Sequence, residues 1–367
     1  MVRFHYGSSK DSDLMYLIGY DIGDAYFFLE VDGKKYVFLN IIDIGGFKEH
    51  STKDVEAVDS SSVSKSDKRD IENPLFSQAF NILDAYSVSG EVVVPTSFPL
   101  HLADALRDGG FSLKVASNWC PERLVKSEEE IANIEEVSKH TIGAFKEVER
   151  ILKESVIEKD EIHYNDEVLT SEFLKQVIEK KLLEVNIVCT AGLIVSSGTQ
   201  TAMPHHSGKG ALRPNETIIV DIFPRSRDHH YFSDMTRTYV KGEPSTEIRK
   251  MYEAVENSQR LSREALKPGI SGTEAYEISA KAIKDAGFEV GKKGYVHSLG
   301  HGVGIDVHES PRLGLKAADT IEQGNVVTVE PGLYYNDIGG VRIEDTVAIT
   351  EDGCRVLTSH ESDWVIK

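Results

Sequence analysis

Residues 217–223 read Thr-Ile-Ile-Val-Asp-Ile-Phe, a short apolar run that one carboxylate, Asp221, interrupts. A run of this length and composition is typical of a strand buried on both faces. An ionised carboxylate is very unfavourable in such a place unless it is paired, protonated or bound to a cation. Asp221 therefore needs a partner that its own strand does not provide.

Two later segments repeat this pattern. Residues 326–332 read Val-Val-Thr-Val-Glu-Pro-Gly, and residues 340–347 read Gly-Val-Arg-Ile-Glu-Asp-Thr-Val. The two-residue period of a strand puts Arg342 and Glu344 on the same face of the second segment. Strands that each carry an inward-facing acid, here Asp221, Glu330 and Glu344, predict a shared cation. The alternative is that each acid lies solvated at a strand end or pairs with a base, for which Arg342 is the main candidate.

An aspartate and a histidine-rich segment extend this set. Asp234 lies thirteen residues after Asp221 and begins Asp-Met-Thr-Arg-Thr-Tyr, which we predict to be the next strand, returning beside the first. Residues 296–309 read Val-His-Ser-Leu-Gly-His-Gly-Val-Gly-Ile-Asp-Val-His-Glu. Glycines let a backbone or a substrate approach closely, and imidazole serves as a metal ligand or an acid near neutral pH. Three histidines in such a segment indicate a functional site.

Four carboxylates and one imidazole suit a pair of divalent cations. Hard oxygen ligands favour Mn²⁺, Mg²⁺ or Co²⁺, and one nitrogen ligand shifts the preference away from Ca²⁺. Four negative charges balance two divalent ions. Two ions about 3.5–4 Å apart can activate a water molecule near neutral pH and polarise a carbonyl group. The sequence therefore predicts two-metal hydrolysis.

The length of 367 residues predicts two domains, at roughly 100–200 residues per domain, and the secondary structure is predicted to be mixed α/β (α+β). Residues 1–120 form a small α/β domain, in which Asp32-Gly33 provides a two-residue hairpin turn between strands. Residues 121–367 form a larger domain, whose first helix begins at Ser127 as its N-cap. The predicted strands cover residues 26–31, 34–39, 91–95, 111–115, 187–189, 217–223, 235–240, 325–329 and 340–349. The further predicted helices cover residues 99–108, 166–181, 246–266 and 273–286.

Composition narrows the class of protein. Sixty acidic residues against 41 basic ones give a net charge of −19 over 367 residues, which repels nucleic acid and anionic membrane surfaces. No segment approaches the roughly 18–20 apolar residues that span a bilayer. The three cysteines lack the close spacing of a metal site and do not suggest a disulfide framework. We expect a cytoplasmic protein without nucleic-acid or membrane partners.

The order of the acids and the histidine resembles a known family. Asp221, Asp234, His301, Glu330 and Glu344 stand in the contexts VDIF, SDMTRT, GHGVGIDVHE, VEPGLY and GGVRIED. This series is similar to the pita-bread metallopeptidases, which include methionyl aminopeptidase, aminopeptidase P and prolidase. The resemblance implies a catalytic domain with a curved, mainly antiparallel sheet over residues 121–367. It also implies a creatinase-like α/β domain over residues 1–120.

The resemblance implies a role for each metal ligand. Asp221 would bind one metal ion through both of its oxygens, and Asp234 and Glu344 would bridge the two ions. His301 and Glu330 would complete the other ion, with Glu330 also accepting the proton of the attacking water. The implied cofactors are two divalent ions, best matched by Mn²⁺ or Co²⁺.

The resemblance also implies substrate contacts for residues that do not bind metal. His308 would stabilise the tetrahedral intermediate, His205 would lie near the scissile nitrogen, and His297 would lie near the prolyl residue. Arg342 and Tyr334 match positions that line or brace the site.

The first domain and His297 favour the proline-specific branch over methionyl aminopeptidase. The predicted substrates are therefore proline-containing peptides, cleaved at the Xaa-Pro bond. We expect an aminopeptidase P-like exopeptidase that acts at the N-terminus of peptides, and the alternative is a prolidase that takes only Xaa-Pro dipeptides. A metal-free creatinase-like hydrolase and a non-enzymatic binding module are disfavoured, because such relatives have lost ligands that are all present here.

Two positions depart from the family pattern. Phe223 stands where the family usually has a glycine, and His206 stands where tyrosine is frequent. Neither is a predicted ligand, so we expect them to affect the substrate pocket and not the metal chemistry. Relatives with this architecture are often homodimers, and we expect a homodimer here.

Overall fold

The computed structural model describes residues 1–65, 71–317 and 319–367. The chain divides into two compact units, Met1–Arg123 and Leu124–Lys367. The boundary that the sequence predicts, between residues 120 and 121, lies three residues before this division. The predicted site residues all lie in the second unit.

The first unit contains a six-stranded sheet in the order β4-β3-β2-β1-β5-β6. Its central hairpin, β2 to β3, turns at Asp32 and Gly33, whose φ angles of 51° and 75° are the positive values that a tight two-residue turn needs. The strands are β1 (Val2–Gly7), β2 (Tyr26–Val31), β3 (Lys34–Leu39), β4 (Glu56–Asp59), β5 (Glu91–Pro95) and β6 (Ser112–Ala116). The helices are α1 (Ser12–Ile18), α2 (Ile41–His50), α3 (Pro74–Ala85) and α4 (Leu100–Asp108).

The second unit is built on two larger sheets, ordered β11-β12-β14-β22 and β16-β15-β17-β20-β21. Neighbouring strands in them are antiparallel except β14 and β22. The strands of these two sheets are β11 (Leu193–Ser197), β12 (Thr217–Ile222), β14 (Met235–Lys241), β15 (Gly300–Gly302), β16 (Glu309–Leu313), β17 (Val326–Val329), β20 (Asp345–Ile349), β21 (Cys354–Val356) and β22 (Val365–Ile366). Three smaller sheets are formed by β7 (Val156–Glu158), β8 (Glu161–Tyr164) and β9 (Glu167–Val168), by β10 (Ile187–Val188) and β13 (Arg225–Ser226), and by β18 (Gly332–Tyr335) and β19 (Gly339–Arg342).

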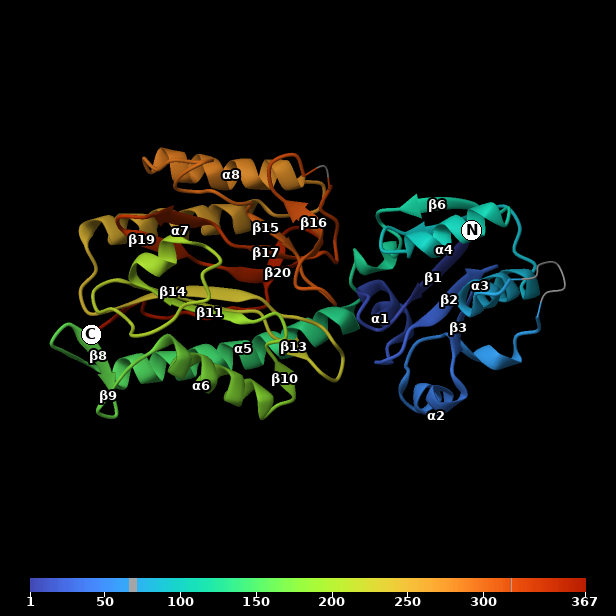
Figure 1. Ribbon diagram of the computed structural model, residues 1–367. Coiled ribbons are helices and arrows are strands. Elements are labelled where there is room, and N and C mark those ends of the chain that lie inside the picture. Colours follow the sequence, from blue (N-terminus) through green and yellow to red (C-terminus); the bar gives the residue numbers. More distant parts are fainter. Residues whose placement is uncertain (66–70, 318) are drawn as a thin grey trace. The chain divides into compact units, whose positions relative to one another are not determined.

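Helices cover the two sheets from opposite sides, as Figure 1 shows. The helices of this unit are α5 (Glu128–Glu154), α6 (Ser171–Leu183), α7 (Thr246–Ala265) and α8 (Gly272–Asp285). The apolar faces of α5 and α6 pack with β11, β12 and β14 into one core cluster. Those of α7 and α8 pack with β17, β19 and β20 into another. The mixed α/β fold with mainly antiparallel sheets is as predicted.

The first helix of this unit begins where the sequence indicates. The Ser127 side chain accepts from the Glu130 backbone N–H, and the Glu130 carboxylate accepts from the Ser127 N–H at 2.8 Å. This reciprocal capping box satisfies two backbone donors that the helix leaves free. Ile134, Val137 and Phe145 of the predicted apolar face are fully buried.

One predicted strand is wrong. Residues 340–349 do not form a single strand, because β19 pairs with β18 and β20 pairs with β17 in a different sheet. The chain changes sheets at Ile343 and Glu344. There the Glu344 N–H bonds to the Thr236 carbonyl at 3.0 Å, which links this segment to β14. The predicted alternation of faces through Glu344 therefore does not hold across the break.

Within the described ranges, none of the helices combines the length and the apolar character that crossing a membrane requires. The predicted cytoplasmic location and homodimer stay predictions.

Candidate metal centre

The five predicted ligands lie at the junction of the two larger sheets. Asp221 lies within β12 and Asp234 directly precedes β14, so both come from the four-stranded sheet. The other three come from the five-stranded sheet: His301 lies in β15, Glu330 directly follows β17 and Glu344 directly precedes β20. Residues more than one hundred positions apart in the chain thus converge on one place.

Three of these side chains already have the spacing of a metal site. Ligand atoms of Asp234, His301 and Glu344 all lie within 4.8 Å of one another, and the three residues are buried. His301 Nε2 is 3.3 Å from Glu330 Oε1 and 3.8 Å from Asp234 Oδ2. Asp221 lines the same pocket as the other four.

Hydrogen bonds from the described residues reach only some of the oxygens of these carboxylates. Among the described residues, Asp221 Oδ1, Asp234 Oδ1 and Glu344 Oε1 are buried oxygens without a hydrogen-bond partner. The opposite oxygens of Asp221 and Glu344 each accept a bond of 2.6 Å, from Arg342 and from Thr236. Buried oxygens without partners are rare and costly. Divalent cations would satisfy them, so the residues fit the metal site that the sequence predicts.

Burial and mutual repulsion perturb these acids. Burial raises the pKa of Asp234 well above its usual value, and the charges of Glu344, Asp221 and Glu330 raise it further. The pKa of Glu344 is raised in the same way. Burial, with Asp221 nearby, raises the pKa of Glu330 to about 8. Bound cations would favour the ionised carboxylates, because opposite charge lowers the pKa of an acid.

His301 is oriented as a metal ligand. Its Nδ1 lies 3.1 Å from the carbonyl oxygen of Gly302, which can only accept, so Nδ1 carries the proton. Nε2 is therefore the nitrogen that faces the carboxylates. Burial lowers the pKa of His301, which keeps the imidazole neutral as a metal ligand requires.

Arg342 connects the ligands to the rest of the pocket. Its guanidinium forms a buried ion pair with Asp221 and donates to the Tyr334 hydroxyl at 2.9 Å. It also donates to Thr236 Oγ1 at 3.3 Å. The alternative that Arg342 neutralises an acid thus holds for Asp221. Among the described residues, no Lys or Arg ion pair is found for Asp234 or Glu344, and the cation hypothesis stands for them.

Tyr334 braces the site and is not among the residues that line the pocket. Its hydroxyl lies 2.9 Å from His297 Nε2, and His297 Nδ1 lies 2.7 Å from the Ser298 carbonyl oxygen. Burial, with the charge of Arg342, lowers the pKa of His297 to about 4, so the ring is neutral at pH 7. Both of its nitrogens are bonded within the protein. A substrate beside His297 would therefore meet ring carbons.

The ligands open into a pocket of about 670 Å³. His205 and His308 line it and are exposed. Partial burial lowers the pKa of His308 to about 4, and the charges of His301 and Arg312 contribute, so His308 is a neutral donor at pH 7. Phe223 also lines the pocket, as expected from its departure from the family pattern. His206 does not, and its Nδ1 accepts from the Gly208 N–H at 2.9 Å.

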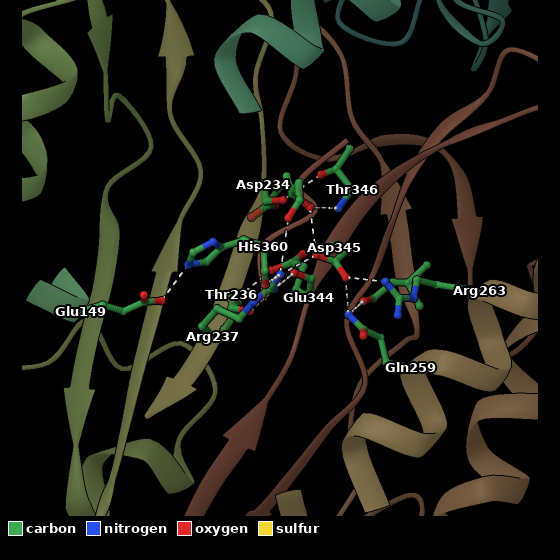
Figure 2. Close-up of polar contacts among 12 residues, drawn as sticks. Glu149, Asp234, Thr236, Arg237, Gln259, Arg263, Glu344, Asp345, Thr346 and His360 are labelled. Carbon is green, nitrogen blue, oxygen red and sulfur yellow. Dashed lines mark hydrogen bonds and ion pairs between the residues drawn. The ribbon is translucent and has the colours of Figure 1, made fainter. Parts of the chain in front are cut away.

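A second buried polar cluster supports the ligands (Figure 2). Arg237 donates to Asp345 Oδ1 at 2.8 Å and to the Glu344 carbonyl at 2.6 Å. Asp345 also accepts from Gln259 and Arg263. The Thr346 hydroxyl donates to the Asp234 carbonyl at 2.7 Å. The backbone of both proposed bridging residues is thereby fixed.

Sequence reasoning missed Arg237, Asp345 and the pocket residue Arg312. A signal existed for the first two. Arg237 lies in an otherwise uncharged stretch of β14, and Asp345 follows Glu344 at the start of an apolar strand. The reasoning applied to Asp221, that a charge in a buried strand needs a partner, would have paired them. Arg312 gives no such signal, because it alternates with apolar residues in β16.

The sequence model of metallopeptidase family M24 matches residues 132–351 of this chain. The chain belongs to metallopeptidase family M24. The matched range includes all five predicted ligands. The prediction of a pita-bread peptidase is confirmed at the level of the family.

Several relatives of this M24 chain are named Xaa-Pro dipeptidase, and others are named only as uncharacterized peptidases. It is 39% identical over 171 residues to a Xaa-Pro dipeptidase of Pyrococcus furiosus, an alignment that covers 46% of this chain and 48% of the relative. The chain spans about half to two thirds of the length of the curated relatives it matches, 48% to 65%. A solved Xaa-Pro dipeptidase from Bacillus anthracis superimposes with a TM-score of 0.83, 20% identity and coverage of 100% and 95%. An X-Pro aminopeptidase from Thermotoga maritima gives 0.80, 21% identity and coverage of 100% and 97%, so both share the fold.

Proposed function

We propose that this M24 chain is a metal-dependent Xaa-Pro dipeptidase, with Asp221, Asp234, His301, Glu330 and Glu344 as ligands of two divalent cations. The observation that carries the proposal is the set of buried carboxylate oxygens without partners, beside the inward-facing His301 Nε2. Mn²⁺ and Co²⁺ suit this mixture of oxygens and one nitrogen. When bound, such ions would supply an activated water and polarise the scissile carbonyl.

Glu330 is the proposed proton acceptor. It lies at the inner wall of the pocket, beside His301, and its own N–H is fixed to the Leu299 carbonyl at 2.8 Å. A carboxylate held in this way can take the proton of the attacking water and return it to the leaving nitrogen.

The histidines of the pocket supply the remaining contacts. We assign to His308 the donation of a neutral N–H to the oxygen that gains charge, and to His205 a contact near the scissile nitrogen. Both are exposed in the pocket and free of an assigned structural bond among the described residues. His297 offers ring carbons, which suit the apolar ring of proline. Proline has no N–H to donate, so a site without a hydrogen-bond acceptor at this position leaves no donor of the substrate unpaired.

Arg312 favours a dipeptide over a longer peptide. It lines the pocket and is exposed. Its positive charge is opposite in sign to the charge of the carboxylates of the candidate metal site. A guanidinium is well suited to a carboxylate, since it can donate two parallel hydrogen bonds. The C-terminal carboxylate of Xaa-Pro would lie one residue beyond the scissile bond. The names of the Pyrococcus relatives agree with this preference, so prolidase, the alternative in the sequence analysis, becomes the first candidate. Aminopeptidase P, which the sequence analysis favoured, becomes the second candidate, because the Thermotoga aminopeptidase shares the fold.

Substrate length tests the proposal directly. With Mn²⁺ or Co²⁺ present, we expect Ala-Pro to be cleaved at least about tenfold better in kcat/KM than Ala-Ala, which corresponds to about 1.4 kcal/mol of discrimination. Ala-Pro-Ala and N-acetylated Ala-Pro should be poor substrates. Preferred turnover of Ala-Pro-Ala would instead establish an aminopeptidase P. Equal cleavage of Ala-Ala would contradict proline specificity altogether.

The role of His308 gives a second test. His308→Ala should retain its metal and lose about 10²–10³-fold in kcat, the usual effect of removing one oxyanion donor. Steady-state kinetics with elemental analysis measure both quantities. A variant that loses metal would show His308 to be a ligand, and near-normal kcat would remove it from the mechanism.

A further inference from the structure

The turn that connects His301 with His308 is folded around one carboxylate. Glu309 follows His308 directly, and its Oε2 accepts from the Asp306 N–H at 3.3 Å. Gly304 lies against the same carboxylate, so closely that a Cβ there would be 2.4 Å from Oε1. The Gly304 N–H in turn donates to the Asp306 carbonyl at 3.0 Å. The Glu309 carboxylate thus contacts the turn at both Gly304 and Asp306.

A lysine from a distant part of the chain fixes this carboxylate. Lys126 Nζ donates to Glu309 Oε1 at 2.6 Å, and the two side chains are only 2% and 8% exposed. Lys126 precedes α5, and its own N–H bonds to the Gly324 carbonyl at 2.9 Å. Glycine at 324 leaves room for this approach, since a Cβ there would lie 3.0 Å from the Lys126 carbonyl oxygen. Both ends of the ion pair are therefore anchored.

We propose that Lys126 and Glu309 are positioning residues that set the place of His308 beside His301. His308 is exposed and next to Glu309, and its ring lies edge-on to His301 at 4.2 Å between centroids. Among the described residues, no side chain forms a hydrogen bond or an ion pair with the His308 ring. Its position is therefore set by the backbone of the turn. The Lys126–Glu309 pair holds this turn, together with the bonds from the Phe232 N–H to the Gly304 carbonyl at 2.8 Å and from the Val303 N–H to the Val326 carbonyl at 3.0 Å. This inference rests on the proposed function, in which His308 donates to the reacting carbonyl oxygen.

A double-mutant cycle separates positioning from a general structural role. Lys126→Met should lower kcat for Ala-Pro about 10- to 100-fold, since a displacement of about 1 Å at a reacting group can have an effect of that size. KM and metal content should change less than twofold. In a His308→Ala background the same substitution should lower kcat less than twofold further, because the group it positions is already absent. Equal losses in both backgrounds, or an unchanged kcat, would overturn the proposal.

Two further variants guard against misfolding and nonspecific effects. Lys126→Met combined with Glu309→Gln leaves no lone buried charge, and Gln can still accept from the Asp306 N–H, so this variant should fold and show the same kcat loss. Lys139→Met removes an exposed ion pair with Glu135 on α5 and should leave kcat unchanged. A combined variant that folds with normal kcat would also refute the inference.

A measurement without turnover distinguishes this inference from the proposed function. In the metal-free protein, the His308 Hε1 proton resonance can be assigned by its loss in His308→Ala. Lys126→Met should shift or broaden that resonance and leave the resonance of His163, in β8, in place. If the unaltered protein does not cleave Ala-Pro, the proposed function fails. An unmoved His308 resonance would refute the positioning role in either case.

Discussion

Asp234→Ala is expected to abolish hydrolysis of Ala-Pro and to lower bound metal. A ligand atom of Asp234 lies within 4.8 Å of ligand atoms of both His301 and Glu344. Asp234 Oδ1 is a buried oxygen without a hydrogen-bond partner among the described residues. We propose that it bridges two cations, so its loss removes a ligand from each. The decrease in kcat should be at least about 10⁴-fold, the scale on which removing one member of an interdependent catalytic set acts.

The measurement combines kinetics with elemental analysis after dialysis against a metal-free buffer. Asp352→Ala is the matched control, because Asp352 is an exposed aspartate in the turn that follows β20. It should retain both metal and activity. Glu344→Ala should behave like Asp234→Ala. Full metal content together with full activity in Asp234→Ala would remove the metal assignment.

Asp345→Ala is expected to lower the free energy of unfolding of the second unit by about 3–5 kcal/mol, the usual effect of breaking a buried ion pair. It leaves the Arg237 guanidinium buried without the carboxylate that it contacts at 2.8 Å. It also removes the acceptor for Gln259 and Arg263. A buried charge without its partner accounts for most of the loss, because desolvation is no longer offset.

Urea unfolding can be followed separately for the second unit. The chain has two tryptophans, and Trp364 stacks on Tyr252 of α7 with ring centroids 4.1 Å apart. In a Trp119→Phe background, fluorescence therefore reports on the second unit alone. The variants should be compared without metal, because an ion that binds only the folded state adds to apparent stability.

A matched surface substitution gives the contrast. Arg260→Met breaks the exposed pair between Arg260 and Glu264 on α7 and should change stability by less than about 1 kcal/mol. If Asp345→Ala were as mild as this control, the Arg237–Asp345 pair would not hold the ligand backbone as described.

Most of the proposed metal ligands could be picked out from the sequence because they carry a local conflict. An acid such as Asp221 within an apolar strand is visible without any knowledge of what lies opposite. The same holds for the histidines spaced among glycines in residues 296–309. The caps and the hairpin turn were predictable for a similar reason, since their hydrogen bonds join residues close in sequence.

The remaining features of the site depend on contacts between residues that lie far apart in the sequence. The sequence does not indicate which of these residues meet. Lys126 and Glu309 are 183 residues apart, and Arg237 and Asp345 are 108 apart. Each of these charges is unremarkable by itself, and only the docking of strands decides which base meets which acid. The break between β19 and β20 at Glu344 was missed for the same reason. A strand pattern continues through it in sequence, while the hydrogen bonds of its two halves go to different sheets.

The placement of ligands on two sheets has a consequence for how activity arises. β12 and β14 supply two aspartates, while β15 and the ends of β17 and β20 supply the remaining three ligands. Neither sheet alone presents more than three of the five. A chain whose sheets have each formed but have not yet docked carries no competent centre. If these residues are the ligands of the proposed dipeptidase, hydrolysis of dipeptides therefore depends on the docking of the two sheets and not on the formation of either sheet alone.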